Sequence, residues 1–228
     1  IDHEAFDCYL SMGYVPGKRC ILQNFNKLPP GHALLFDLKT GTLRDWCYWK
    51  LPDYDNKLKD IVNESELLDE IEHLLEDSVR RQMIADVPVG VLLSGGVDSS
   101  LITSMAVRVS SNVKTFTVGF PGYGELDETK HARLIAEYFG TQHTELIAEL
   151  PSSDLLIKLA NQYDEPIIDS SMIPTYLVSQ LIHKHCKVAL GGDGGDELFG
   201  GYGHYSRIQW LKKKLTLVPS LFRKPVSF

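Results

Sequence analysis

The hydrophobic positions divide the chain into two parts with different patterns. In residues 1–52, short apolar segments such as residues 33–36 lie between turns rich in glycine and proline, which predicts small strands or hairpins. From Asn63 onward, apolar residues recur at the spacing of a helix. Pro52 discourages a helix across this boundary. We therefore expect a small β-rich or irregular segment over residues 1–52 and a separate region over residues 53–228.

The first long helix is expected from Asn63 to Met83. Its apolar positions are Leu67, Leu68, Ile71, Leu74, Leu75 and Met83. Acidic residues lie early in this stretch, and Arg80 and Arg81 lie late, as the helix dipole favours. Asn63, with Glu66 three residues later, resembles a capping box in which Asn replaces the usual Ser or Thr.

Beyond this helix, short apolar runs alternate with amphipathic stretches. Strands are predicted over residues 87–93, 113–120, 142–148 and 187–192. Helices are predicted over residues 98–109, 126–140, 152–162 and 172–185. Strict alternation of this kind implies an α/β fold with a doubly wound, mostly parallel, Rossmann-like sheet. A ligand is then expected where glycine-rich turns leave the carboxyl ends of strands.

The composition narrows the class of partner. The 228-residue chain carries a net charge of −7 and has a pI near 5.6, which argues against nucleic acid as its main partner. No apolar run approaches the roughly 20 residues of a membrane span, and the first residues do not form a signal peptide. The cysteines show no zinc spacing, which favours reduced thiols and a cytoplasmic protein. Because Ile1 is not a start methionine, we expect a piece of a longer protein.

The last stretch, residues 207–228, carries six Lys or Arg residues and no acid. Such a stretch is most often a solvated surface helix, which is the interpretation we favour. A flap that attracts anions is the alternative. No internal repeat or low-complexity tract changes this picture.

The segment LLSGGVDSS, residues 92–100, ends an apolar strand with two adjacent glycines. Gly95 and Gly96 lack the Cβ atoms that would keep an anion away, and they permit positive φ. The following helix begins at once, so its free N–H groups and positive dipole end face the same spot. Three hydroxyls add donors, from Ser94, Ser99 and Ser100. This combination predicts a phosphate site.

The type of phosphate site follows from what surrounds the glycines. The lysine of a Walker GxxxxGK loop is missing, and the GxGxxG spacing of a dinucleotide loop is absent because the glycines are adjacent. The carboxylate of Asp98 would repel bare phosphate, but it suits a divalent metal lying between it and the phosphate oxygens. The alternative is that Asp98 is an ordinary N-cap acid in a sharp turn.

A second glycine-rich turn, LGGDGGDELFGGY at residues 190–202, follows the last predicted strand. It holds six glycines and three acids, Asp193, Asp196 and Glu197. These acids could complete a metal site opposite Asp98, and Gly191 with Gly192 would let a flat base lie on the backbone. A flexible acidic surface loop is the alternative, while the spacing of an EF-hand calcium loop is absent.

Together these motifs resemble the synthetase domain of the glutamine-hydrolysing asparagine synthetase family. SGGVDSS is similar to the SGGxDSS motif of the N-type ATP pyrophosphatases, the PP-loop superfamily, which implies an adenine nucleotide alpha hydrolase-like fold. Further segments narrow the resemblance to the asparagine synthetases, because they occur in the family's order: YVPG, LPPGHALLFD, FTVGF, LDETKHARLIAEYFGTQH, DEPIIDSSMIPTYLVS and GGDGGDELFGGY. The resemblance covers essentially the whole chain.

The resemblance implies that ATP activates a side-chain carboxylate as an acyl-adenylate, releasing pyrophosphate, and that ammonia then displaces AMP. The pyrophosphate end of ATP would be held by Ser94, Gly95, Gly96, Asp98, Ser99 and Ser100. Mg²⁺ would be bound by Asp98 and Asp196 and would neutralise the charge of the departing pyrophosphate. The adenosine would be surrounded by Leu92, Val118, Gly191 and Gly192.

Asp193 departs from the family's more usual SGEGxDE pattern, because Asp stands where Glu is common. The resemblance makes Asp193 a candidate catalytic acid. Because Asp is shorter than the usual Glu, the difference affects which carboxylate the protein is expected to amidate. Aspartate, amidated to asparagine, is the expected substrate. A carboxylated sugar or a secondary metabolite is the alternative, and a catalytically dead nucleotide-binding scaffold is a third reading. Glu165 and Asp169, in DEPIIDSS, are candidate substrate or structural acids.

For the intact protein, the resemblance implies a glutaminase domain that supplies ammonia from glutamine. Residues 1–52 would be the end of that domain and the link onward, and residues 53–228 the N-terminal part of the synthetase domain. The family's cysteine nucleophile and its later, lysine-bearing synthetase half have no counterpart here. The chain is therefore expected to bind MgATP weakly, without glutaminase activity and without completing synthesis. A homodimer is left open.

Overall fold

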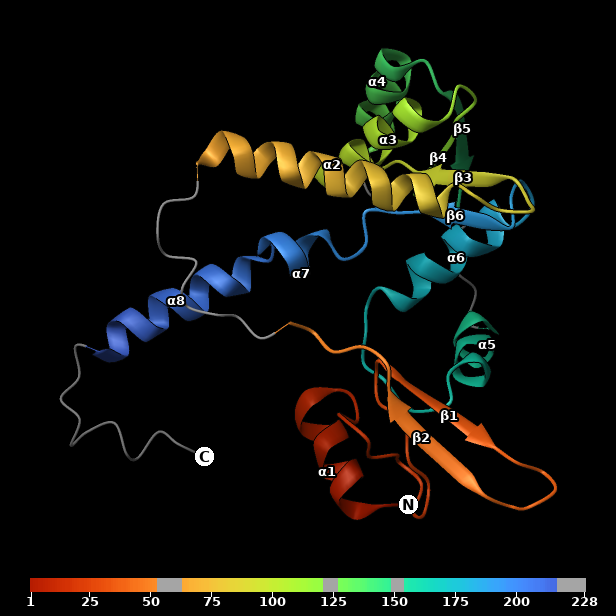
Figure 1. Cartoon of the computed structure of the whole chain (residues 1–228), viewed down its shortest axis with the longest axis vertical. Helices are drawn as coiled ribbons and strands as arrows, with labels where there is room; N and C mark the ends of the chain where they lie inside the picture. Colours follow the sequence, from red (N-terminus) through yellow and green to blue (C-terminus); the bar gives the residue numbers. More distant parts are fainter. Residues whose placement is uncertain (53–62, 121–126, 149–153, 217–228) are drawn as a thin grey trace. The chain divides into compact units, whose positions relative to one another are not determined.

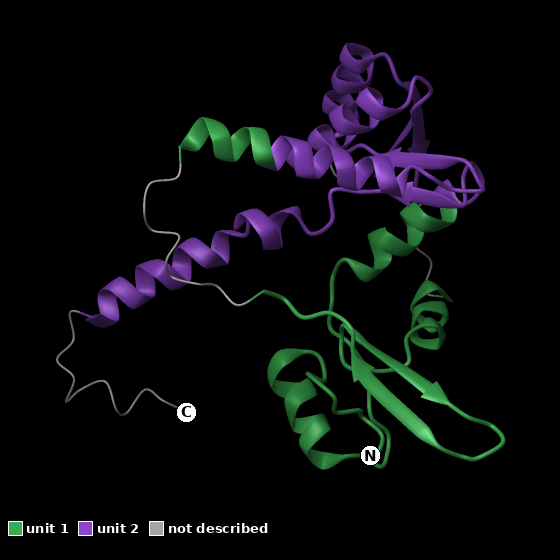
Figure 2. Ribbon diagram, in the orientation of Figure 1, with its two compact units in different colours: residues 1–70, 149–181 green, residues 71–148, 182–228 purple. Residues whose placement is uncertain are grey.

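The structure, a computed structural model, describes four stretches of the chain: residues 1–52, 63–120, 127–148 and 154–216. Figure 1 shows the path of the backbone. The chain divides into two compact units, which Figure 2 colours separately: residues 1–70 with 149–181, and residues 71–148 with 182–228. The expected boundary near residue 52 stays a prediction, because residues 53–62 lie outside the described stretches.

The first unit begins with a helix that the hydrophobic pattern did not predict. α1 (His3–Met12) is capped by Asp2, whose carboxylate accepts a hydrogen bond from the amide of Ala5 at 2.8 Å. The helix ends at Gly13, which has a left-handed conformation with a φ of 81°. Its buried residue is Ala5. Ala5, Cys8, Tyr9 and Met12 do recur at helical spacing, but this stripe spans only two turns and lies beside the turn-rich residues that follow, so the overall pattern of the segment does not predict the helix.

A hairpin follows, as predicted for this segment. β1 (His32–Phe36) pairs antiparallel with β2 (Leu43–Cys47), in a register that runs from His32 opposite Cys47 to Phe36 opposite Leu43. The hairpin exposes large apolar side chains, namely Leu34, Leu35, Phe36, Leu43 and Trp46. A two-stranded hairpin alone is marginally stable in water, so these side chains are suited to contact another surface.

Two helices complete the first unit, and both confirm predicted helices. α5 (Asp154–Gln162) buries Leu155 and Leu159. α6 (Met172–Ile182) ends three residues earlier than expected and leads into the second unit.

The second unit is built on a four-stranded parallel sheet with the order β5-β4-β3-β6. The strands are β3 (Val89–Leu92), β4 (Lys114–Gly119), β5 (Gln142–Ile147) and β6 (Val188–Leu190). The helices are α2 (Glu64–Gln82), whose first turns belong to the other unit, α3 (Val97–Val109), α4 (Thr129–Phe139), α7 (Gly195–Phe199) and α8 (Gly203–Thr216). The predicted α/β fold with a parallel sheet is confirmed. β6 is shorter than predicted because the glycine-rich turn begins at Gly191.

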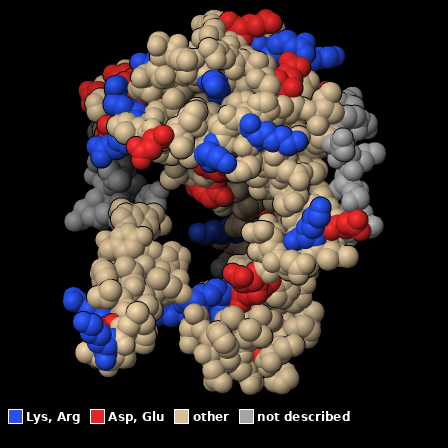
Figure 3. Space-filling view, turned by 90° about the vertical axis from the view of Figure 1, so that its right-hand side faces the viewer, with Lys and Arg blue, Asp and Glu red and all other residues tan. Residues whose placement is uncertain are grey.

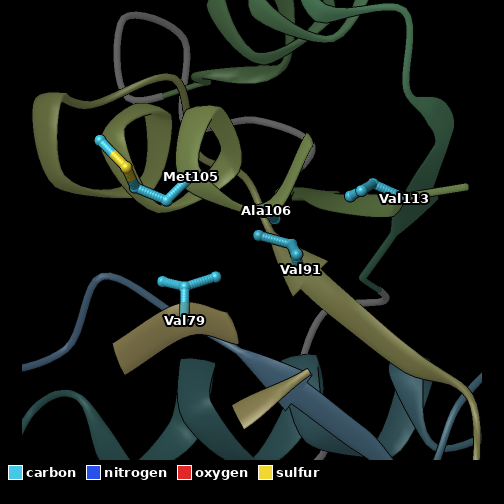
Figure 4. Close-up of a cluster of buried hydrophobic side chains, with 5 residues drawn as sticks. All are labelled: Val79, Val91, Met105, Ala106 and Val113. Carbon is cyan, nitrogen blue, oxygen red and sulfur yellow. The ribbon is translucent and has the colours of Figure 1, made fainter. Parts of the chain in front are cut away.

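The core of the second unit lies around the central strand β3. Val91 belongs to a buried cluster whose other members come from α2, from α3 and from the residue before β4 (Figure 4). The cluster consists of Val79, Val91, Met105, Ala106 and Val113. Two residues later, Leu93 packs on Ala132 and Ala136 of α4. Residues i and i+2 of a strand share a face, so β3 and the residue after it bury one continuous apolar face.

The other face of β3 is also covered, at Gly90. A Cβ at this position would lie 2.6 Å from the ring of Phe116 and 2.9 Å from the Sγ atom of Cys186. Only glycine leaves room for both side chains. Burial on both faces explains why this strand reads as a continuous apolar run.

α2 begins with a variant of the predicted capping box. The side-chain oxygen of Asn63 accepts a hydrogen bond from the amide of Ser65 at 3.2 Å, as an N-cap residue does. Glu66, however, accepts from the side-chain amide of Asn63 at 3.0 Å. In a standard box Glu66 would instead accept from the backbone N–H of the cap residue. The difference arises because Asn, unlike Ser or Thr, carries a second polar group that reaches Glu66.

The surface carries charges of both signs. On the face shown in Figure 3, Lys and Arg side chains lie among Asp and Glu side chains. α8 is exposed along almost its whole length and covers the first part of the predicted basic surface helix; residues 217–228 lie outside the described stretches. All four cysteines are free thiols. Within the described part of the chain, no helix combines the length and apolarity needed to cross a membrane.

Candidate functional site

The predicted site residues come together at one edge of the parallel sheet. β4, β3 and β6 are neighbours in the sheet and run parallel, so their carboxyl ends lie side by side. Leu92 ends β3, Val118 lies near the end of β4, and Gly191 follows β6. The strand order therefore brings the two glycine-rich turns next to each other.

The first loop packs closely against α4. Gly95 has a φ of +86°, and a Cβ there would lie 2.7 Å from the amide nitrogen of Ala132 and 2.7 Å from the Cβ of His131. Both the backbone conformation and the lack of space therefore require glycine. Gly96 is the N-cap residue of α3 and makes no side-chain cap. The first turn of α3 thus presents backbone N–H groups that an anion can satisfy.

The serines bond to one another and to the loop backbone. The hydroxyl of Ser99 accepts from the amide of Ser94 at 3.2 Å and donates to the carbonyl of Gly96 at 3.2 Å. Since Ser99 has one hydroxyl proton, Ser94 is the donor in the 3.0 Å contact between the two hydroxyls. Ser99 thus holds the loop, and its contact with pyrophosphate stays a prediction. Ser100 lies half-buried in the first turn of α3.

The second turn packs on the start of α3 through its glycines. A Cβ at Gly192 would lie 2.8 Å from the Cβ of Asp98 and 3.0 Å from the amide nitrogen of Ser99. A Cβ at Gly195 would lie 2.6 Å from the Cγ of Asp98. The second turn was predicted to accommodate a flat base at its glycines. The lack of a Cβ at Gly192 and Gly195 also lets this turn approach Asp98 closely.

A pocket of about 190 Å³ lies between the second turn, α2 and α3. Its polar lining includes Asp98, Asp193 and the backbone from Gly191 to Gly195. Its apolar lining includes Leu75, Val79, Leu101, Ile102, Leu198 and Phe199. Of the predicted site residues, the pocket brings together Asp98, Asp193, Gly191 and Gly192. The remaining residues assigned to ATP do not line it, namely Leu92, Ser94, Gly95, Gly96, Ser99, Ser100 and Val118.

The two predicted metal ligands face different neighbours. The carboxylate of Asp98 packs on Gly195, whereas a Cβ at Gly201 would lie 1.9 Å from the Oδ1 atom of Asp196. Asp193 lines the pocket together with Asp98. Among the described residues, no three His, Cys, Asp or Glu side chains gather as a metal site. Proteins commonly bind Mg²⁺ with one or two carboxylates while phosphate oxygens supply further ligands, so a shared role of Asp98 and Asp196 in binding Mg²⁺ stays a prediction.

Glu197, the third acid of this turn, is engaged by Tyr202. The Tyr202 hydroxyl donates to Glu197 Oε1 at 2.8 Å. This hydrogen bond, together with partial desolvation and the charges of Glu197 and Asp196, raises the pKa of Tyr202 to about 12. The phenol therefore stays protonated at neutral pH and keeps Glu197 within the turn.

Comparison with known proteins distinguishes among the families that share such a loop. The sequence model of one family, described as asparagine synthase, matches residues 70–227. The chain belongs to the asparagine synthase family. This confirms the resemblance read from SGGVDSS and from the second glycine-rich turn.

Named relatives agree with the family assignment. A Methanocaldococcus jannaschii protein, named among the glutamine-hydrolysing asparagine synthetases, is 40% identical over 89% of this chain and 39% of its own length. Glutamine-hydrolysing asparagine synthetase 1 of Bacillus subtilis is 35% identical over 98% of this chain and 34% of its own length. The chain thus spans about a third to two fifths of these relatives. Among solved structures, the NH3-dependent NAD synthetase of Campylobacter jejuni matches with a TM-score of 0.40 and 17% identity, covering 59% of this chain and 60% of that one.

In this asparagine synthase chain, the two candidate acids of DEPIIDSS, Glu165 and Asp169, make hydrogen bonds within the protein. The carboxylate of Glu165 accepts from the amide of Ile21 at 2.7 Å and pairs with the ammonium group of Lys27 at 2.6 Å. Asp169 accepts from the amide of Ser171 at 2.8 Å, at the start of α6. Burial alone would raise the pKa of Glu165, but the hydrogen bonds from Lys27 and Ile21 outweigh it and lower that pKa. Glu165 therefore joins two segments that lie far apart in the sequence.

Glu165→Gln is expected to destabilise the first unit by about 1 kcal/mol at pH 7, because it removes a charged hydrogen-bond acceptor. The pKa of Glu165 is lower in the folded than in the unfolded chain, so its stabilisation is present above the usual carboxyl range and is lost as the pH falls. Urea unfolding at pH 7 and pH 3 measures the difference in the free energy of unfolding between Glu165→Gln and the wild type. The difference between variant and wild type should be smaller at pH 3 than at pH 7, and Glu70→Gln, on the exposed surface of α2, should show no difference at either pH.

Thr117 was not among the predicted site residues, although it contacts the loop. This threonine of β4 is 5% exposed, and its hydroxyl donates to the carbonyl of Leu93, where the loop begins. The sequence did hold a signal, since a threonine in a buried strand must find a hydrogen-bond partner. The identity of that partner follows only from the strand order.

Proposed function

We propose that this chain is the ATP-binding part of a glutamine-dependent asparagine synthetase. The intact protein would adenylate the side-chain carboxylate of aspartate with release of pyrophosphate, and ammonia from glutamine would then displace AMP to give asparagine. The observation that carries the proposal is the close packing of two glycine-rich turns around Asp98 at the carboxyl ends of β3 and β6. The names of the relatives favour aspartate over a sugar acid as the acceptor.

In this proposal the first loop binds the pyrophosphate end of ATP. The N–H groups at the start of α3 and around Gly95 and Gly96 would donate to phosphate oxygens, and the helix dipole adds to the attraction. The N–H of Gly96 donates to the Ser94 hydroxyl at 3.3 Å and would exchange that partner for phosphate. These donors are oriented before the ligand arrives, so they stabilise the negative charge of the leaving group without reorganisation. Mg²⁺, when bound, would neutralise phosphate charge, and Asp98 with Asp196 would hold it. Asp193, which lines the pocket, would contact the reacting groups as an acid.

The adenosine would lie against the ends of the neighbouring strands. Leu92 and Val118 supply apolar, half-buried side chains there, and Gly191 with Gly192 supplies flat backbone. A base stacked on glycine backbone needs no side chain to move aside.

The hairpin of the first unit would contact the rest of the glutaminase domain of the intact protein. Residues 1–52 would then be the end of that domain and residues 53–228 the start of the synthetase domain. The apolar side chains exposed on the hairpin support this, because they need cover that a two-stranded hairpin lacks. The free thiols support a reducing, cytoplasmic location.

The proposal is tested by exchange of labelled pyrophosphate into ATP, catalysed by the full-length protein that contains this chain. Exchange should require both Mg²⁺ and aspartate, and glutamate should not replace aspartate. Exchange that occurs with a uronic acid but not with aspartate would instead identify the sugar-acid amidotransferase. Absence of exchange with every carboxylate, despite bound MgATP, would favour the scaffold.

A further inference from the structure

One peptide group at the root of the first loop is held by side chains at both of its polar atoms. The group joins Leu93 to Ser94. Its carbonyl accepts a hydrogen bond from the hydroxyl of Thr117, and its N–H donates to the hydroxyl of Ser99 at 3.2 Å. The two side chains come from different elements, β4 and α3, and are only 5% and 8% exposed. Rotation of this peptide group would therefore break one buried and one partly buried hydrogen bond at once.

Thr117 makes its bond at the point where the backbone ladder stops. The last backbone bond from this end of β3 to β4 runs from the amide of Leu93 to the carbonyl of Phe116 at 2.9 Å. The hydroxyl of Thr117 then reaches the carbonyl of Leu93. The side chain thus extends the link between the strands by one bond, onto the first residue of the loop.

The orientation of this peptide group sets the direction of the amides that follow. Gly95 comes next, with its φ of +86°, and Gly96 begins α3. A loop of this kind binds an anion well only if its N–H groups already converge, since reorienting them on binding lowers the affinity. A residue that fixes the Leu93–Ser94 peptide group therefore raises the affinity of the loop for an anion indirectly, through the conformation of the loop.

We propose that Thr117 is a positioning residue for the pyrophosphate end of ATP. It touches no ligand in this proposal; it holds the loop in its binding conformation through the carbonyl of Leu93, and Ser99 holds the same peptide group from the opposite side. The inference rests on the proposed function for the identity of the ligand. The conformation of the loop itself can be measured without any ligand.

The test compares Thr117→Val with Thr115→Val in this chain. Valine keeps the shape of threonine and removes only the hydroxyl. Thr115 lies on the same face of β4 and is fully buried, but its hydroxyl contacts Thr141 Oγ1 at 2.8 Å and His143 Nδ1 at 3.0 Å, away from the loop. Calorimetric titration with MgATP should give a Kd raised about five- to tenfold in Thr117→Val and unchanged in Thr115→Val. Thr117→Ser should restore the wild-type Kd.

A double-mutant cycle adds a readout that a general loss of stability would not move. If Thr117 and Ser99 hold the same peptide group, Thr117→Val and Ser99→Ala should be non-additive in their effect on the Kd. Hydrogen exchange supplies the ligand-free measurement. The amide of Ser94, compared with that of Val91 in the core, should exchange faster in Thr117→Val and not in Thr115→Val.

The outcomes separate the two proposals. If wild type binds no MgATP, the proposed function fails, and the exchange of the Ser94 amide still decides whether Thr117 holds the loop. If wild type binds MgATP while Thr117→Val binds as tightly and exchanges at the same rate, Thr117 is not a positioning residue. Additive effects in the cycle would likewise overturn the shared action on one peptide group.

Discussion

Gly95→Ala is expected to abolish measurable binding of MgATP and to lower the free energy of unfolding by about 2–4 kcal/mol. Two independent costs add up at this position. A φ of +86° is unfavourable for any residue with a Cβ, and that Cβ would lie 2.7 Å from the backbone of Ala132 and from His131. Backbone atoms of α4 cannot swing aside as a flexible side chain can. The loop must therefore change shape or α4 must move, and either change disperses the converging N–H groups.

Gly140→Ala is the matched control. Gly140 ends the same helix, α4, with a φ of +65°, but a Cβ there would meet nothing within 4 Å. It should therefore cost about 1 kcal/mol through its conformation alone and leave the Kd for MgATP unchanged. Urea unfolding and calorimetric titration of both variants measure the two quantities. Equal losses of stability, or tight binding by Gly95→Ala, would show that α4 does not constrain the loop as described.

The sequence predicted most of the second unit because several local signals agree there. Val91 and its neighbours form a continuous apolar run, which is typical of a strand buried on both faces. The glycines that follow this run mark the turn. The capping pair Asn63 and Glu66 located the start of α2 correctly, although the Glu66 contact differs in detail. α1 differs from the expectation because its apolar stripe, from Ala5 to Met12, is short and is followed by a turn-rich segment that dominates the pattern of residues 1–52.

The candidate site was less predictable than the fold, because its geometry depends on contacts across the sheet. Thr117 lies on β4, and Leu93 directly follows the neighbouring strand β3. The sequence of neither segment identifies the other as its hydrogen-bond partner. Asp196 and Asp193 stand three residues apart in one turn, and only the fold decides that Asp193 lines the pocket while Asp196 packs on Gly201. The sequence does not decide whether Glu165 is a substrate or a structural acid, because its partners, Ile21 and Lys27, lie more than 130 residues before it.

Asp98→Asn is expected to change the affinity for ATP in opposite directions with and without Mg²⁺. With Mg²⁺ present, loss of the carboxylate should raise the Kd on the order of a hundredfold, because a charged ligand of the metal is removed. With EDTA present, the variant should bind ATP at least as tightly as wild type, because the carboxylate repels bare phosphate. Asn has the same shape, so the packing on Gly195 is kept. Titrations under both conditions measure the two constants.

The sign of the second effect separates a metal ligand from an acid that only stabilises the first turn of α3, whose N-cap residue is Gly96. An acid in the first turn of α3 stabilises the helix by about 0.3–1 kcal/mol, and its loss would have the same small effect with or without Mg²⁺. Asp86→Asn, at an exposed acid outside the loops, controls for net charge. The variants Asp196→Asn and Asp193→Asn then identify the second carboxylate that binds the metal. Replacing a metal ligand should raise the Kd for ATP when Mg²⁺ is present and not when EDTA is present. If Asp98→Asn weakens binding equally in EDTA, Asp98 acts through the loop and not through the metal.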